Sequence, residues 1–251
     1  MKIGLFGDSF TCSSDESSHF AWYNLLAEKL DSTIHNFEYN CTERGYGLGG
    51  TSTFWSYKKF LKFYDKHDFI FFVAGDCLKY PKMVKIFKNS EYEKPITGIT
   101  DIEWFSKNEN VSDDGKDILE KIKIWYLISD TEHLEVTQNL ILEDIERRTD
   151  SKLLLLAGDN KTAFTEARQT FCQVPFGMWD FTRVIHESLG LHENKWGIIE
   201  NERPDKIAAH MTEPANRLFA DMMYDMITLN KKPKLPSYIH HDFDYTYYYG
   251  K

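Results

Sequence analysis

Gly7-Asp8-Ser9-Phe10 places a serine hydroxyl directly after a short apolar segment, Lys2 to Phe6. That segment is typical of a buried strand. In an open α/β sheet, ligands bind at the carboxyl ends of the strands, so Ser9 would point into a crevice with Asp8 beside it. Backbone N–H groups of the turn could stabilise an oxyanion there. The alternative is a turn serine that only caps the next segment.

A glycine-rich segment, residues 44–52 (RGYGLGGTS), is the second group that could do chemistry. It contains the pattern G-x-G-x-x-G at Gly45, Gly47 and Gly50, which is typical of a dinucleotide-binding loop between a strand and a helix. That fingerprint normally occupies the first strand-to-helix turn of its domain, which here is the turn at Ser9. The remaining alternative is a turn whose glycines adopt positive φ.

His210 is the third candidate, in a predicted loop just before the last predicted helix. A histidine can take a proton from a serine near neutral pH. Asp205, five residues earlier, could orient the imidazole ring. A histidine that only supports the structure is the alternative, since the chain has nine of them.

Taken together, these segments resemble the SGNH/GDSL hydrolase family, which are serine esterases on a flavodoxin-like sheet. Residues 7–10 (GDSF) resemble the first block of the family, which implies that Ser9 is the nucleophile. Residues 47–52 (GLGGTS) resemble the second block, which implies that the Gly50 N–H donates to the oxyanion. Residues 210–221 (HMTEPANRLFAD) resemble the last block, which implies that His210 is the base.

The chain departs from the family pattern at two positions. Asp76 stands where the third block usually has an asparagine that donates to the oxyanion, and an ionised carboxylate cannot donate. The open alternatives are that backbone donors suffice, that Asp76 is protonated, that Asn160 substitutes, or that catalysis is weak. Ile207 stands three residues before His210, where the family has the aspartate of its catalytic triad. Asp205 would have to take the place of that aspartate, or the site would work as a Ser-His dyad.

Three functions therefore remain open. The first is an esterase that acts on a small-molecule or glycan ester. The second is a catalytically inactive relative that binds a glycan or a protein, and the third is a nucleotide-binding protein that uses Gly45 to Gly50. Five aromatic residues near the predicted loops favour an acetylated carbohydrate slightly over a lipid: Trp55, Tyr57, Trp104, Trp179 and Trp196.

The predicted elements that position these residues alternate between strand and helix. Continuous apolar segments at residues 68–74 and 152–157 predict strands covered on both faces. The short apolar segment at residues 2–6 predicts a buried first strand, and residues 33–39 predict a second strand. Helical spacing of apolar residues predicts helices at 19–30, 54–64, 117–127, 131–148 and 212–229, the first of them capped by Ser17 or Ser18. This alternation predicts an α/β fold with a doubly wound parallel sheet of about five strands. With the resemblance, it predicts a three-layer, flavodoxin-like domain over residues 1–232.

Turn signals between residues 78 and 130 predict an insertion after the third strand, and residues 233–251 form a tail rich in Tyr, His and Asp. The net charge of −9, from 39 acidic and 30 basic residues, argues against a nucleic-acid partner. We expect no membrane span, no metal and no cofactor. Without a signal-peptide pattern at its start, we expect a cytoplasmic protein whose four cysteines are reduced.

Overall fold

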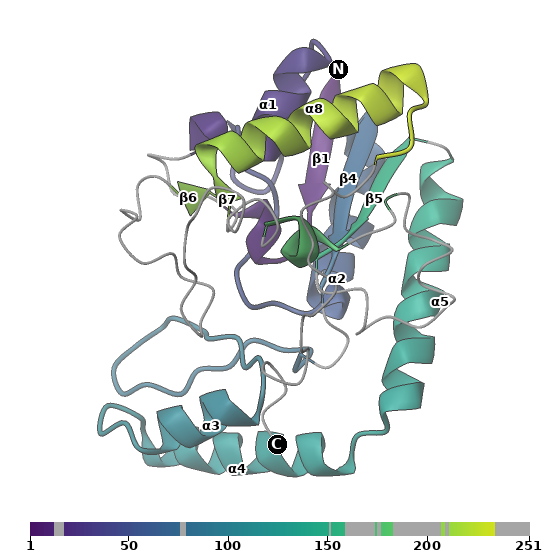
Figure 1. Cartoon of the computed structure of the whole chain (residues 1–251). Coiled ribbons are helices and arrows are strands. Elements are labelled where there is room, and N and C mark those ends of the chain that lie inside the picture. Colours follow the sequence, from purple (N-terminus) through teal and green to yellow (C-terminus); the bar gives the residue numbers. More distant parts are fainter. Residues whose placement is uncertain are drawn as a thin grey trace, which may run out of the picture.

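The apolar segments of the sequence pair into one five-stranded sheet, in the order β3-β2-β1-β4-β5. Figure 1 shows β1, β4 and β5 side by side. The computed structural model describes residues 1–12, 18–75, 79–150, 152–158, 174, 177–182, 207–208 and 211–233. Four strands are parallel: β1 (Lys2–Phe6), β2 (Thr33–Asn36), β4 (Phe69–Ala74) and β5 (Leu153–Ala157). A two-residue edge strand, β3 (Cys41–Thr42), pairs antiparallel with β2.

The strand order reverses at β1, because the chain adds β2 on one side of β1 and then β4 and β5 on the other. The register aligns the carboxyl ends of the inner strands, with Phe6 opposite Phe72 and Ala74 opposite Ala157. This is the doubly wound order of flavodoxin-like folds, in which ligands typically bind beyond the carboxyl ends of the strands where the order reverses. Ser9 follows β1 directly, so the fold places it at this position.

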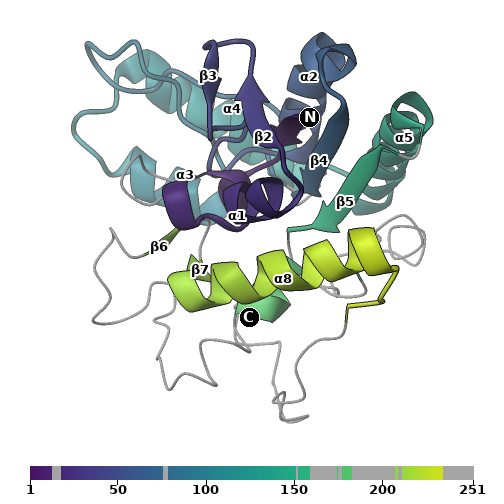
Figure 2. The same ribbon diagram turned by 90° about the horizontal axis from the view of Figure 1, so that it is seen from above.

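Helices cover both faces of the sheet (Figure 2). One face carries α1 (Trp22–Lys29) and α8 (Glu213–Leu229), and the other carries α2 (Thr53–Phe63) and α5 (Thr131–Thr149). The predicted three-layer α/β/α fold is therefore confirmed. Among the described residues, no helix combines the length and the apolar character that crossing a membrane requires.

Successive strand residues face opposite layers, as the pleat requires. In β4, Phe71 and Val73 join the buried cluster beneath α1 and α8, whereas Ile70 and Phe72 join the cluster beneath α2 and α5. Because both faces of β4 and β5 are covered, these two strands carry apolar residues at every position. This explains the uninterrupted apolar segments of the sequence.

The insertion lies beyond the carboxyl ends of the strands, where it forms α3 (Ile99–Ser106) and α4 (Asp113–Ile128) (Figure 1). It has its own buried cluster, which includes Ile86, Ile102 and Leu119. The helix predicted at 117–127 begins four residues earlier, because the Ser112 hydroxyl accepts a hydrogen bond from the Gly115 N–H at 2.9 Å. Neither α3 nor the short antiparallel pair β6 (Ile207–Ala208) and β7 (Met211–Thr212) was predicted.

Two predicted boundaries were wrong for local reasons. The strand predicted at 33–39 ends at Asn36, whose side-chain oxygen accepts the N–H groups of Glu38 and Tyr39 and so turns the chain. The helix predicted from His19 begins at Trp22, and Ser18 lies in a preceding 3₁₀ turn instead of capping it. Ser17, the other predicted cap, lies outside the described residues.

Candidate active site at the carboxyl ends of β1 and β4

Ser9 lies half-buried at the start of a 3₁₀ turn, Ser9–Thr11, that follows β1. Asp8 caps this turn, because its Oδ1 accepts the Phe10 N–H at 3.2 Å. The Asp8 carbonyl oxygen also accepts the N–H of Thr11 at 3.0 Å and its hydroxyl at 2.7 Å. Hydrogen bonds to both the side chain and the main chain of Asp8 therefore fix the backbone around Ser9.

A buried ion pair joins this turn to the insertion. The Lys79 Nζ lies 3.0 Å from Asp8 Oδ2, and the two side chains are 14% and 2% exposed. Both carboxylate oxygens of Asp8 thus have partners within the protein, which favours a role in holding the turn over direct contact with a substrate. Sequence reasoning missed Lys79; the one available signal was that a buried aspartate needs a cation nearby.

The glycine-rich segment runs along the end of β1 and packs against the protein itself. The Tyr46 N–H donates to the Leu5 carbonyl at 2.7 Å. A Cβ on Gly45 would lie 2.6 Å from the Leu5 oxygen, and a Cβ on Gly47 would lie 1.8 Å from Thr11 Oγ1. The space where a side chain would stand on Gly45 and Gly47 is therefore filled by Leu5 and Thr11. A pyrophosphate could not approach the backbone from that side, which argues against the dinucleotide-loop interpretation.

The next two glycines lie between Ser9 and the insertion. The nearest atom to a Cβ on Gly49 would be Ser9 Cβ, at 3.8 Å. Gly50 has a φ of +76° and faces Pro95 of the insertion, where a Cβ would lie 2.9 Å from Pro95 Cγ. The predicted oxyanion donor Gly50 therefore follows directly after a glycine that lies near Ser9, and its positive φ favours glycine.

Cys12 lies beside the same turn but is not a competing nucleophile. Burial, with a smaller contribution from the negative charge of Asp8, raises the pKa of its thiol to about 12. The thiol is therefore neutral near pH 7, and the thiolate is the nucleophilic form.

The end of β4 contacts Asp8 through a glycine. A Cβ on Gly75 would lie 3.0 Å from Asp8 Oδ2, so a larger residue would crowd the ion pair. The Gly75 carbonyl accepts hydrogen bonds from Thr53 Oγ1 at 2.9 Å and from Gln138 Nε2 at 3.3 Å. The neighbouring Asp76 and the candidate substitute Asn160 lie outside the described residues.

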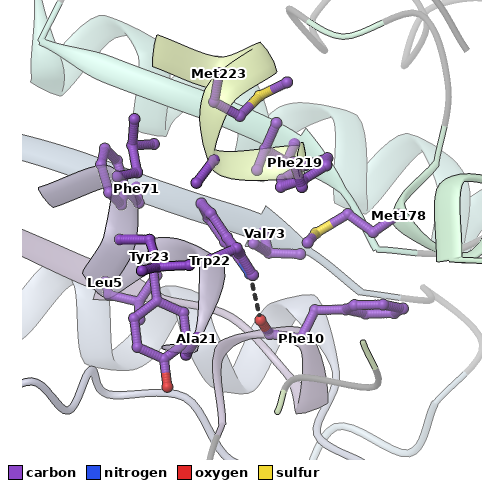
Figure 3. Close-up of a cluster of buried hydrophobic side chains, with 14 of the residues drawn as sticks. Leu5, Phe10, Ala21, Trp22, Tyr23, Phe71, Val73, Met178, Phe219 and Met223 are labelled. Atoms are coloured by element: carbon purple, nitrogen blue, oxygen red, sulfur yellow. Dashed lines mark hydrogen bonds between the residues drawn. The ribbon is translucent and has the colours of Figure 1, made fainter. Parts of the chain in front are cut away.

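His210 and Asp205 also lie outside the described residues, but Met211, the residue after His210, is described and fully buried. A buried hydrogen-bonded path runs from Phe10 to Met211. The Trp22 indole N–H donates to the Phe10 carbonyl at 2.9 Å (Figure 3). The Trp22 backbone N–H donates to Asn216 Oδ1 at 2.8 Å, and Asn216 Nδ2 donates to the Met211 carbonyl at 2.9 Å.

Asn216 explains why α1 begins without a local cap. Its side chain, contributed by α8, satisfies the first N–H of α1 in place of the usual serine or aspartate. Phe10, which follows Ser9, and Met211, which follows His210, are thereby linked through Trp22 and Asn216. Phe10 and Met211 also belong to one hydrophobic cluster.

Within the described part of the chain, no three His, Cys, Asp or Glu side chains gather as metal ligands would. Comparisons with protein-family models, curated proteins and solved structures gave no match to this chain.

Proposed function

We propose that the protein is a serine ester hydrolase in which Ser9 is the nucleophile and His210 the base. The observation that carries the proposal is the buried path from Phe10 through Trp22 and Asn216 to Met211. This path links Phe10, next to Ser9, with Met211, next to His210. Ser9 and His210 are 201 positions apart in the chain. The location of Ser9 beyond β1, where the strand order reverses, supports the same proposal.

In the proposed reaction, His210 removes the proton from the Ser9 hydroxyl as the oxygen attacks the ester carbonyl. The N–H groups of Ser9 and Gly50 donate to the resulting oxyanion. As the ester C–O bond breaks, His210 gives its proton to the leaving alkoxide. The alcohol departs, and the acyl group remains on the Ser9 oxygen as an acyl-enzyme. Water, deprotonated by His210, attacks the acyl group, and the carboxylic acid is released as Ser9 regains its proton. Asp205 would orient the imidazole.

Labelling with a fluorophosphonate probe tests the nucleophile directly. The folded protein should be labelled at Ser9 and should hydrolyse p-nitrophenyl acetate, with an acetylated sugar as a second substrate. Ser9→Ala should lose both properties, and His210→Gln should lose most of the turnover. The matched control is His19→Gln, because His19 is exposed in the turn before α1 and should not matter.

A catalytically inactive relative would give a different result. The folded protein would then show no labelling at Ser9 and no turnover that depends on His210. This outcome would reject the hydrolase and favour a binding protein on the same fold.

The residue at position 76 provides a separate test. If Asp76 stands in for an oxyanion donor, Asp76→Asn should raise activity or leave it intact, because the amide can donate a hydrogen bond. A large loss of activity would show that the carboxylate of Asp76 has a role of its own.

A further inference from the structure

The insertion contacts both of the turns that carry the proposed nucleophile and the proposed oxyanion donor. Near its start, the Lys79 ammonium lies 3.0 Å from Asp8 Oδ2, and Asp8 directly precedes Ser9. Farther along, Pro95 lies against Gly50, because a Cβ on Gly50 would lie 2.9 Å from Pro95 Cγ. The insertion therefore reaches the site at two separate points, one for each turn.

The contact at Lys79 joins opposite charges that are largely shielded from water, since the Lys79 and Asp8 side chains are 14% and 2% exposed. Charges attract more strongly in such surroundings than in bulk water. Asp8 transmits the contact to the backbone of the turn. Its Oδ1 accepts the Phe10 N–H at 3.2 Å, and its carbonyl oxygen accepts the Thr11 N–H at 3.0 Å. A change at Lys79 should therefore move the turn itself.

A tyrosine of α4 joins the two contacts to each other. The Tyr126 hydroxyl donates to the carbonyl oxygen of the buried Ile96 at 3.0 Å and accepts the Tyr80 N–H at 3.1 Å. The Tyr80 N–H also donates to the Ile96 carbonyl oxygen, at 3.2 Å. These two residues directly follow Lys79 and Pro95, respectively. The three hydrogen bonds therefore set the spacing between the two residues that reach the site.

We propose that the insertion positions the nucleophile relative to the oxyanion donor. Lys79 holds the Ser9 turn, and Pro95 limits the movement of Gly50. Tyr126 fixes these two contacts relative to each other. This inference rests on the proposed function and deepens it, because it makes residues outside the catalytic pair responsible for the geometry of attack. A misplacement of about 1 Å in such geometry can lower a rate about 100-fold.

The rate at which a fluorophosphonate labels Ser9 tests the positioning role of Lys79. Lys79→Met should slow labelling at least about tenfold, and Lys79→Arg, which retains a cation for Asp8, should restore most of the rate. With p-nitrophenyl acetate, Lys79→Met should lower kcat and leave KM unchanged, because substrate binding is not affected. A variant that is only less stable would keep the wild-type kcat per folded molecule, and urea unfolding would give the folded fraction.

Tyr126→Phe tests the link between the two contacts and removes only a hydroxyl. It should slow labelling about two- to tenfold, which corresponds to the net contribution of a typical hydrogen bond. Two matched controls lie in the insertion as well. They are Tyr92→Phe, because Tyr92 is 79% exposed, and Lys85→Met, because Lys85 pairs with Glu91 where both side chains are exposed. Both controls should be labelled at the wild-type rate.

Hydrogen–deuterium exchange tests the contacts without a catalytic readout. Lys79→Met should speed exchange in the peptide that covers residues 5–12. Tyr126→Phe should speed exchange there and in the peptide that covers residues 44–53. The two control variants should leave exchange in both peptides unchanged.

If folded Lys79→Met is labelled at the wild-type rate, the positioning role is wrong and the hydrolase stands. If Lys79→Met does not fold, Tyr126→Phe decides, and labelling of Tyr126→Phe at the wild-type rate would overturn the inference. Unchanged exchange in both peptides would overturn it as well. A wild-type protein that is not labelled at Ser9 would reject the proposed function and the positioning role with it.

Discussion

Lys79→Met should destabilise the protein strongly, because among the described residues it leaves the buried Asp8 carboxylate with the Phe10 N–H as its remaining partner. Removing one member of a buried ion pair typically costs about 3–5 kcal/mol. Lys79 is 14% exposed, so water reaches part of the pair, and we expect the lower end of that range, about 3 kcal/mol. For a chain of this length, that loss would lower the urea midpoint by about 1 M.

Urea unfolding monitored by tryptophan fluorescence would measure the effect. The double variant Asp8→Asn with Lys79→Met should lose less than Lys79→Met alone, because it contains no unpaired buried charge. Lys85→Met is the matched control, since Lys85 pairs with Glu91 where both side chains are exposed, at 52% and 94%, and its midpoint should not change. If Lys79→Met unfolds at the same midpoint as Lys85→Met, the buried ion pair does not stabilise the Ser9 turn.

Three further outcomes are expected. Burial, with a smaller contribution from the charge of His35, lowers the pKa of His67 from 6.5 to about 4. Between these two pH values the unfolded chain binds a proton at His67 that the folded chain does not. The free energy of unfolding should therefore fall as the pH drops from about 6.5 to about 4. Discounted for partial exposure, the loss is about 1–2 kcal/mol, and unfolding midpoints across that range should fall less steeply in His67→Phe. Asn216→Ala leaves a buried N–H and a buried carbonyl unpaired and should cost about 3 kcal/mol in urea unfolding, whereas a loss below 1 kcal/mol would contradict the path through Asn216. Gly47→Ala should lower the melting temperature by several degrees because its Cβ would collide with Thr11, and Gly98→Ala, with nothing within 4 Å, should not.

Much of the fold could be predicted because local patterns reflect the environment of each element. The uninterrupted apolar residues of β4 and β5 predicted strands buried on both faces, and both are buried between helices. The spacing in α5 and α8 predicted their ends to within one residue. The elements that the patterns missed, α3 and the two-residue strands β3, β6 and β7, are too short to show a period.

The candidate site could be predicted only in part. Ser9 follows the first strand in the sequence, so its position beyond the sheet could be inferred from that strand alone. The placement of Gly49 near Ser9 depends on how the glycine-rich segment packs against the Ser9 turn, and no spacing in the sequence reports this.

The sequence by itself determined the layers of the protein, because a strand buried on both faces leaves an uninterrupted apolar segment and a helix buried on one face leaves a helical period of apolar residues. Only the tertiary structure decided which polar groups meet. Lys79 pairs with Asp8 across 71 positions, and Asn216 caps α1 across 194 positions. Such pairs follow from the strand order, which brings distant segments together at the same end of the sheet, and a local pattern carries no information about that contact.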